Sequence, residues 1–253
     1  MPADPEQHTT GIAAREVLRR ADAGFGLTLF IEKGLPLAGG EGGSAASAVA
    51  GAVAANLLLV HPLPWSALLE AALTAEATVS GHHADNVAAT LLGGFVLIRS
   101  LAPLDLVRLP VPPALRVVLA HPEYSLPTRE GRAVLPKAIS RDDAVYQAAQ
   151  VGALVSALHS GNLALLGRAI EDRIAEPARA ALLPGFREAK RAALAAGALG
   201  CSISGSGPTA FALVEGETEG SRVAAAMTTA YRSVGIACTA RIAAPDLEGA
   251  RQV

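Results

Sequence analysis

The apolar positions in the first third of the chain change from one regular spacing to another. Residues 11–21 (GIAAREVLRRA) repeat at helical spacing, whereas residues 26–32 (GLTLFIE) alternate and are rich in side chains that favour strands. After a glycine-rich stretch, an alanine-rich apolar run predicts a helix over 44–59 that ends at a proline-containing turn. A second helix is predicted over 65–80, with Ser66 as its N-cap.

The rest of the chain mixes both spacings, without the strict alternation of a doubly wound sheet. Residues 82–86 (HHADN) are predicted to form a loop, and residues 95–100 (FVLIRS) a strand. Residues 102–113 contain four prolines and are the predicted junction between a domain over 1–107 and a domain over 108–253. The remaining predicted elements are strands over 115–122, 208–216 and 236–243, and helices over 141–159, 162–174, 185–198 and 218–234.

Composition limits the partners of the chain. Its 253 residues carry 21 Lys and Arg against 23 Asp and Glu, so the net charge is −2 and no binding of nucleic acid or anionic lipid is predicted. The most apolar run, residues 45–60, is shorter than the roughly 20 residues that span a bilayer. The polar N-terminus is unlike a signal peptide, and the two cysteines are widely separated, so a cytoplasmic protein with free buried thiols is predicted.

The loop between the first predicted strand and the next helix contains most of the candidate chemistry. Residues 34–43 hold five glycines and one proline, and Ser44 follows at the start of the helix. Glycine permits positive φ and lets several N–H groups approach one phosphate, while the helix N-terminus adds positive charge. The Ser44 hydroxyl is a candidate ligand for Mg²⁺ or a phosphate oxygen. The alternative is a tight turn that serves only helix–strand packing.

Two common phosphate-binding motifs do not explain this loop. A Walker loop requires Gly-Lys, and that dipeptide does not occur in the chain. Gly40, Gly42 and Ala45 match the dinucleotide pattern G-x-G-x-x-G/A, but no second strand ending in an acidic residue follows about 20 residues later.

The motif Pro36-x-x-x-Gly40-x-Gly42-x-Ser44-Ala45-Ala46 resembles the phosphate loop of the GHMP small-molecule kinases. Further stretches resemble the homoserine kinase family within that group, and they follow the family's order along nearly the whole chain. These stretches are SGHHADN (80–86), T-x-x-x-R with a following Leu-Pro (128–136), EDRIAEPAR (171–179) and GCSISGSGPTAF (200–211).

The resemblance implies an α+β fold of the GHMP kinase type. An N-terminal phosphate-loop domain and a ferredoxin-like C-terminal domain would bind ATP in the cleft between them. The turn at 205–207 would pack beside the phosphate loop and help to shape the site. The residues expected to contact ATP are Pro36, Leu37, Ala38, Gly39, Gly40, Glu41, Gly42, Gly43, Ser44, Ala45 and Ala46.

The same resemblance implies roles for residues outside the loop. Glu76, otherwise an ordinary solvated helix residue, would hold Mg²⁺ together with Ser44. His83, Asp85 and Asn86 would line the acceptor pocket, with Asp85 and Asn86 near the reacting hydroxyl. Zinc is disfavoured at the His82–Asp85 cluster, because adjacent histidines point in divergent directions and no further ligand pair completes a tetrahedral site.

The resemblance also implies that two arginines would determine which acceptor substrate binds. Arg132 and Arg179, otherwise ordinary surface arginines, would bind an α-carboxylate bidentately, with Thr128 beside them. The catalytic residues expected from the resemblance are Asp85, Asn86 and Arg179. Positioning and charge stabilisation, with no dedicated base, would carry the rate.

The chain departs from the family pattern in two places. The usual G-L-G-S-S reads Gly40-Glu41-Gly42-Gly43-Ser44, so one hydroxyl is missing and a carboxylate is added. Glu41 would be harmless if it pointed to solvent and costly to ATP affinity if it pointed inward. The chain also begins after the family's first strands and their A-N-x-G-type motif. An incomplete N-terminal sheet with an exposed edge is therefore expected, and a misassigned start is the favoured explanation.

The predicted activity is ATP-dependent phosphorylation of the L-homoserine hydroxyl, in threonine biosynthesis, with ATP and Mg²⁺ as cofactors. Two alternatives remain open. One is a GHMP kinase for another small alcohol, and the other is a truncated, non-catalytic nucleotide-binding paralogue. A homodimer is possible by analogy with the family.

Overall fold

The chain forms two compact units in the computed structural model, which describes residues 4–36, 38–79 and 81–252. The two units are not continuous in sequence. The division into domains over 1–107 and 108–253 stays a prediction. The first unit comprises Met1–Pro36, Gly42–Arg108 and Asp246–Val253, and the second comprises Leu37–Glu41 and Leu109–Pro245.

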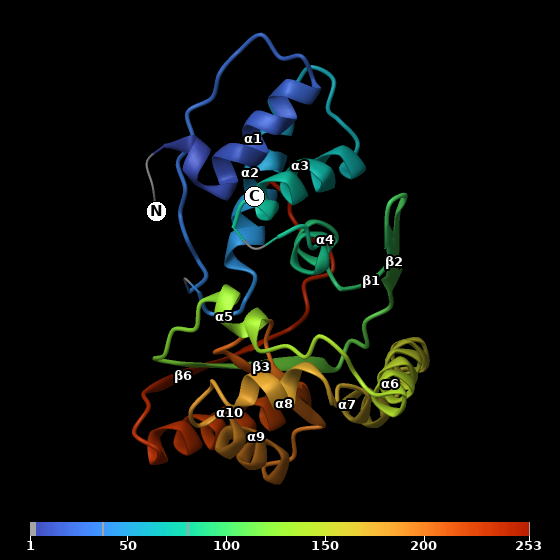
Figure 1. Cartoon of the computed structure of the whole chain (residues 1–253), viewed down its shortest axis with the longest axis vertical. Coiled ribbons are helices and arrows are strands. Elements are labelled where there is room, and N and C mark those ends of the chain that lie inside the picture. Colours follow the sequence, from blue (N-terminus) through green and yellow to red (C-terminus); the bar gives the residue numbers. More distant parts are fainter. Residues whose placement is uncertain (1–3, 37, 80, 253) are drawn as a thin grey trace. The chain divides into compact units, whose positions relative to one another are not determined.

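The first unit is mainly helical (Figure 1). After a short 3₁₀ turn, η1 (Pro5–Gln7), its elements are the helices α1 (Thr9–Arg20), α2 (Gly43–Asn56), α3 (Trp65–Ala77) and α4 (Asp85–Leu92) and the two-stranded sheet of β1 (Phe95–Leu101) and β2 (Leu104–Leu109).

Small side chains let α1 and α2 approach closely. A Cβ atom on Gly51 would lie 2.2 Å from the carbonyl oxygen of Thr10, so only glycine fits at this crossing. The alanines of α2, such as Ala48 and Ala52, are fully buried in the same core. The alanine-rich run is thus explained by close helix packing, and it fixes the direction in which the start of α2 points.

The C-terminal residues return to the first unit. Gly94 donates its N–H to the Asp246 carbonyl at 2.6 Å, and Ala250 donates to the Leu91 carbonyl at 3.3 Å. A Cβ on Gly93 would lie 2.6 Å from the backbone nitrogen of Gly249. Residues 246–250 therefore pack against the end of α4 and the approach to β1.

The strand predicted over 26–32 is wrong. This segment is not in a sheet, although Leu27 and Leu29 pack on the helical core and Phe30 is 96% exposed. Buried and exposed side chains therefore alternate along the segment as predicted, but a strand also needs a hydrogen-bonding neighbour. Within the described part of the first unit, β1 and β2 form the only sheet, and they pair with each other.

Other local predictions also need correction. Ser66 is not the N-cap of α3, because Pro64 occupies that position and Ser66 lies inside the helix. The proline-containing stretch 102–113 includes the strand β2, and Asp85 and Asn86 belong to α4 rather than to a loop. The helix predicted over 162–174 ends earlier, at Ala169.

The second unit is built on a four-stranded antiparallel sheet in the order β4-β5-β3-β6. Its strands are β3 (Leu115–Pro122), β4 (Gly200–Ile203), β5 (Ala210–Glu215) and β6 (Cys238–Ala243). Its helices are α5 (Thr128–Ala133), α6 (Arg141–Ser160), α7 (Leu163–Ala169), α8 (Ala175–Ala180), α9 (Phe186–Ala195) and α10 (Gly216–Ser233). The sequence prediction missed α5, α8 and β4, each of which has only four to six residues.

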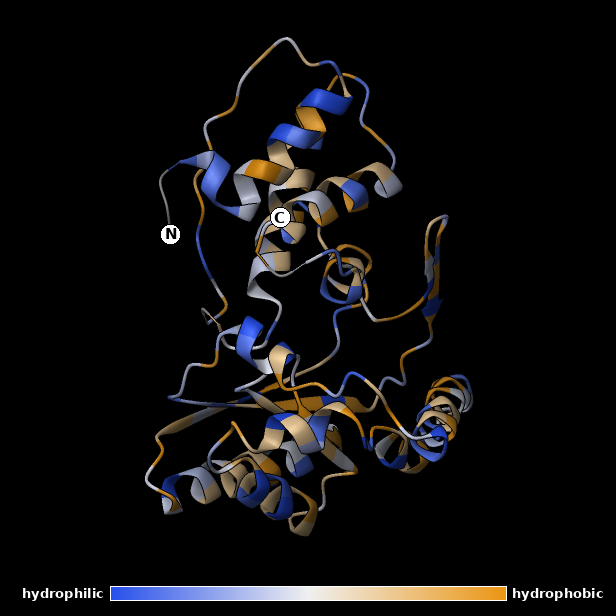
Figure 2. Cartoon of the chain, viewed as in Figure 1, coloured by the Kyte–Doolittle hydropathy of each residue, from blue (hydrophilic) through white to orange (hydrophobic). Residues whose placement is uncertain are grey.

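The strand–helix–strand–strand–helix–strand succession of β3, β4, β5 and β6 with that order is the ferredoxin-like arrangement expected from the sequence. Helices α9 and α10 cover one face of the sheet (Figure 1), and Figure 2 shows hydrophobic residues concentrated in its strands. Val118, Phe186 and Met227 are among the residues buried between these layers. Cys201 and Cys238 are buried and unpaired as predicted, and burial raises the pKa of Cys201 to about 12.

Glu16 on α1 gives a stability prediction that depends on pH. Its hydrogen bond from Arg19 is the main reason that its pKa is lowered from 4.5 to about 2. A lowered carboxyl pKa stabilises the fold above about pH 4.5, and this stabilisation is lost as the pH falls toward about 2. Glu16→Gln is therefore expected to lower unfolding free energy by about 1 kcal/mol at pH 7 and by less at pH 3, as measured by urea denaturation. The control Glu6→Gln removes an exposed pair with Arg15 and should change neither value.

Candidate functional site

The N-terminus of α2 has no side-chain cap. Gly42 occupies the N-cap position with φ of 72°, and no hydrogen bond from a described side chain satisfies the first N–H groups of the helix. Open N–H groups at a helix start, together with the helix dipole, favour an anion. A Cβ on Gly43 would make only ordinary contact, 3.5 Å from the Pro36 carbonyl oxygen, so the serine usual in the family would fit here.

Lys33 adds a positive charge to this helix start, and the sequence analysis missed it. Its Nζ donates to the Gly43 carbonyl at 3.1 Å and also contacts the Ser47 hydroxyl. The signal in the sequence is a single lysine just ahead of the glycine-rich loop. A lone lysine before a loop is too common to be selected without the fold.

Ser44 and Glu76 are brought together as the sequence predicted. The Ser44 hydroxyl, in the first turn of α2, donates to Oε1 of Glu76 near the end of α3 at 2.7 Å. Glu76 is only 3% exposed, so it is not the ordinary solvated helix residue of the alternative interpretation. The Thr9 hydroxyl donates a hydrogen bond to the Ser44 carbonyl at 3.0 Å, which links this turn of α2 to α1.

The start of α4 lies beside the same loop within the first unit. A Cβ on Gly42 would lie 3.4 Å from Oδ1 of Asn86. Asp85 accepts the N–H of Asn86 on its own carboxylate at 2.8 Å, and both side chains are exposed. His83 is also exposed, while His82 instead lines a hollow with Arg20 and Glu70.

The first half of the glycine-rich loop belongs to the second unit and packs on the turn between β4 and β5. Thr209 donates its N–H to the Gly39 carbonyl at 3.2 Å, and the Ser204 hydroxyl donates to the Gly40 carbonyl at 2.9 Å. A Cβ on Gly40 would lie 2.4 Å from the Ser204 carbonyl oxygen, so no other residue fits. Packing of the turn at 205–207 beside the loop is thus present within this unit.

Glu41 does not point to solvent, which is one of the two orientations considered from the sequence. Its side chain is 3% exposed and forms an ion pair with Arg241. The carboxylate is therefore buried within the second unit.

Arg179 connects three motifs of the second unit. Its Nε donates to the Gly131 carbonyl at 3.0 Å, and its Nη1 donates to the Gly205 carbonyl at 2.8 Å. A Cβ on Gly131 would lie 2.9 Å from Cβ of Ser206, so α5 packs directly on the 205–207 turn. Arg132 follows Gly131 on α5, which places the two predicted carboxylate-binding arginines on neighbouring elements.

Helix α8, which carries Arg179, is held by a charge cluster that the sequence analysis did not single out. Asp172 accepts the N–H groups of residues 174, 175 and 176 and so caps the helix. Glu176 pairs with Lys190 on α9 and accepts the Ser202 hydroxyl at 2.6 Å. The segment EDRIAEPAR thus supplies both Arg179 and the groups that fix its helix.

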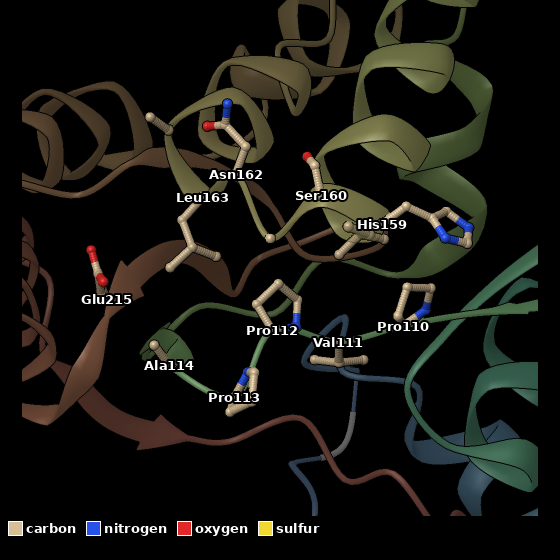
Figure 3. Close-up of a pocket in the computed structure, with 13 residues that line it drawn as sticks. Pro110, Val111, Pro112, Pro113, Ala114, His159, Ser160, Asn162, Leu163 and Glu215 are labelled. Atoms are coloured by element: carbon tan, nitrogen blue, oxygen red, sulfur yellow. The ribbon is translucent and has the colours of Figure 1, made fainter.

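Another hollow in the second unit, of about 660 Å³, lies away from these motifs (Figure 3). It is lined by the segment 110–114, by the end of α6 with His159 and Ser160, and by Glu215. None of the predicted site residues lines it.

The structure thus gathers the predicted residues into two sets, one in each unit. Ser44, Glu76, Asp85 and Asn86 belong to the first unit, and Arg132 and Arg179 belong to the second. Leu37 lies outside the described residues, and Thr128 begins α5 but its side chain is likewise not described. In the described part of the chain, no helix is long and apolar enough to span a bilayer.

Comparison with known proteins identifies the family. The profile of the GHMP kinases N terminal domain matches residues 8–94, and that of the GHMP kinases C terminal matches residues 154–233. A homoserine kinase of Chlorobium phaeobacteroides (strain BS1) is 43% identical over 241 residues, which cover 92% of this chain and 75% of the relative. A homoserine kinase of Arabidopsis thaliana is 43% identical over 258 residues, covering 100% of this chain and 70% of the relative.

Among solved structures, the homoserine kinase from Cytophaga hutchinsonii matches with a TM-score of 0.90 and 41% identity, covering 98% of this chain and 79% of that one. The α+β fold of the GHMP type expected from the sequence is confirmed. Both domain profiles and full-length relatives agree with the motifs described above. The chain therefore belongs to the homoserine kinase family of the GHMP kinases.

Proposed function

We propose that this protein transfers the γ-phosphoryl group of ATP to the hydroxyl of L-homoserine. The observation that carries the proposal is the pairing of Ser44 with the buried Glu76 at 2.7 Å, directly behind the uncapped start of α2. This arrangement supplies the two things that a triphosphate needs, N–H groups for its oxygens and a carboxylate for its cation. The names of the relatives supply the acceptor.

Ser44 and Glu76 fit a magnesium ion. Mg²⁺ prefers oxygen ligands at 2.0–2.1 Å in octahedral geometry, so two neighbouring ligand oxygens lie about 2.9 Å apart. The 2.7 Å between Ser44 Oγ and Glu76 Oε1 is close to that spacing. In the loaded enzyme the hydroxyl proton would turn away from Glu76, and the bound cation would neutralise charge on the β- and γ-phosphates.

The loop backbone would bind the phosphoryl oxygens. Alternate residues Ala38, Gly40 and Gly42 have positive φ values of 54°, 77° and 72°. Such alternation is typical of backbone concavities that bind anions through successive N–H groups. These donors are fixed before reaction, so they stabilise developing charge without reorganisation.

The acceptor would be held by charge and hydrogen bonding. Arg179 donates to the carbonyls of Gly131 and Gly205, so its guanidinium is anchored at the 205–207 turn, and Arg132 follows Gly131 on α5. We assign them to the α-carboxylate of the amino acid. Asp85 and Asn86, at the exposed start of α4, would orient the hydroxyl that attacks the phosphorus. The rate would come from positioning rather than from a dedicated base.

The test is a coupled assay of ADP release with homoserine, mevalonate and galactose as acceptors, together with calorimetry of ATP binding in the presence of magnesium. Homoserine-dependent ADP release with O-phosphohomoserine as product is expected. Turnover only with another alcohol would show that the acceptor is wrong. Absence of ATP binding by folded protein would overturn the kinase proposal itself.

A further inference from the structure

Glu41 lies in an environment that the phosphate-loop role does not explain. Its Oε2 pairs with Arg241 on β6, and its Oε1 accepts the Thr209 hydroxyl at 3.0 Å. His121 on β3 lies 3.8 Å from the same Oε1 and bonds Thr209 Oγ1 through its Nδ1 at 2.8 Å. A carboxylate that is 3% exposed is therefore met by one guanidinium, one hydroxyl and one imidazole.

The partners of Glu41 share the sheet face that is opposite α9 and α10. Val118 and Ala120 of β3 point into the core under those helices, so the intervening Leu119 and His121 face the other way. Arg241 pairs in register with Leu119 and shares its face. The side chain of Glu41 thus attaches the loop to this face of the sheet, at β3 and β6.

This segment of the loop has little stiffness of its own. Glu41 lies between Gly40 and Gly42, which both have positive φ, and glycine loses more conformational freedom on ordering than any other residue. Besides the side chain of Glu41, residues 39–41 are held by two hydrogen bonds to their carbonyls, from the Thr209 N–H to Gly39 and from the Ser204 hydroxyl to Gly40. The ion pair with Arg241 is the only charged contact among the anchors of the described residues 38–41.

We propose that Glu41 is a positioning residue that orders the phosphate-binding loop by clamping it to Arg241, Thr209 and His121. The clamp, residues 41, 121, 209 and 241, keeps the glycine N–H groups in the arrangement that accepts phosphate oxygens. The inference rests on the proposed function, because it assumes that this loop binds ATP. It also explains how a carboxylate can occupy this loop without opposing the triphosphate, since its charge is neutralised by the second unit.

Two variants test the clamp. Glu41→Gln removes the charge but keeps the size, and Arg241→Met removes the partner, which is 45% exposed and therefore replaceable without opening the core. Each should raise KM for ATP about tenfold while leaving KM for homoserine within about twofold of wild type. Arg241→Lys, which keeps the charge but not the planar fork, should restore part of the ATP affinity.

Glu217→Gln is the matched control, because it removes an exposed ion pair between α10 and Arg116 of β3 in the same unit. It should change neither KM. Amide hydrogen exchange of residues 39–43 should be faster in Glu41→Gln and unchanged in the control.

The proposal is overturned if folded Glu41→Gln and Arg241→Met both bind ATP as wild type does, or if both KM values rise together. Thermal melting of each variant identifies any that fail to fold, and Arg241→Met decides the question if Glu41→Gln is one of them. Calorimetric affinity for magnesium–ATP is measured for the same set. The clamp is therefore judged on nucleotide binding even if homoserine proves not to be the acceptor, in which case only the proposed function fails.

Discussion

Glu76→Gln is expected to lower kcat by about a hundredfold to a thousandfold. The substitution keeps the size of the side chain and a hydrogen-bonding partner for Ser44, but it removes the negative charge that would hold the cation. Glu76 is buried and accepts the Ser44 hydroxyl at 2.7 Å, so the lost charge lies directly at the proposed cation site. The measurement is steady-state ADP release over a range of magnesium concentrations, in which the variant should require more magnesium for half-maximal rate.

The matched control is Glu70→Gln on the same helix. Glu70 is 54% exposed and pairs with Arg20 on the surface, so its loss should leave kcat and the magnesium dependence unchanged. A Glu76→Gln enzyme that kept its rate within a few-fold of wild type would refute the assignment of this carboxylate to the cation.

Arg179→Ala is expected to raise KM for homoserine about a hundredfold while KM for ATP changes by no more than about threefold. The guanidinium lies at the meeting point of α5, α8 and the 205–207 turn, so its removal takes away a carboxylate partner and loosens the position of Arg132. Initial rates with each substrate varied in turn provide the test. Arg179→Lys should recover little, because lysine lacks the planar fork.

Arg187→Ala, an exposed arginine on the neighbouring helix α9, is the control for loss of a positive charge and should leave both KM values unchanged. Equal increases in the two KM values for Arg179→Ala would point to a general disturbance of the second unit. The acceptor assignment would then be wrong.

The spacing of apolar residues in the sequence predicted the long helices and strands well and the short ones poorly. Helices α1, α2, α6 and α10 and strand β3 were predicted within a few residues of their limits, because each is long enough for its period to be read. Helix α8 and strand β4 were missed because four to six residues contain too little periodicity. The strand prediction for segment 26–32 failed for a different reason, since its alternation persists but no described strand pairs with it.

The residues of the candidate site also fall into those that the sequence predicted and those that it did not. Ser44 was predicted from the phosphate-loop motif and Glu76 from the family resemblance, and the fold brings the two within hydrogen-bond distance. Lys33, Arg241, His121 and Lys190 were missed because their importance comes only from what they touch. A charged residue that acts through a long-range contact leaves no local pattern in the sequence.

The return of residues 246–250 to the end of α4 has a consequence for dissecting the polypeptide. A fragment of residues 1–108 would lack residues 246–250, and with them the Asp246 carbonyl that accepts the Gly94 N–H. The end of α4 that Gly249 and Ala250 cover would then be exposed. The complementary fragment would lose residues 39–41 from the face of its sheet. We therefore expect each half to be less stable alone than in the intact chain, and co-expression of the two halves, rather than isolation of either, to be the practical route to a split version of this enzyme.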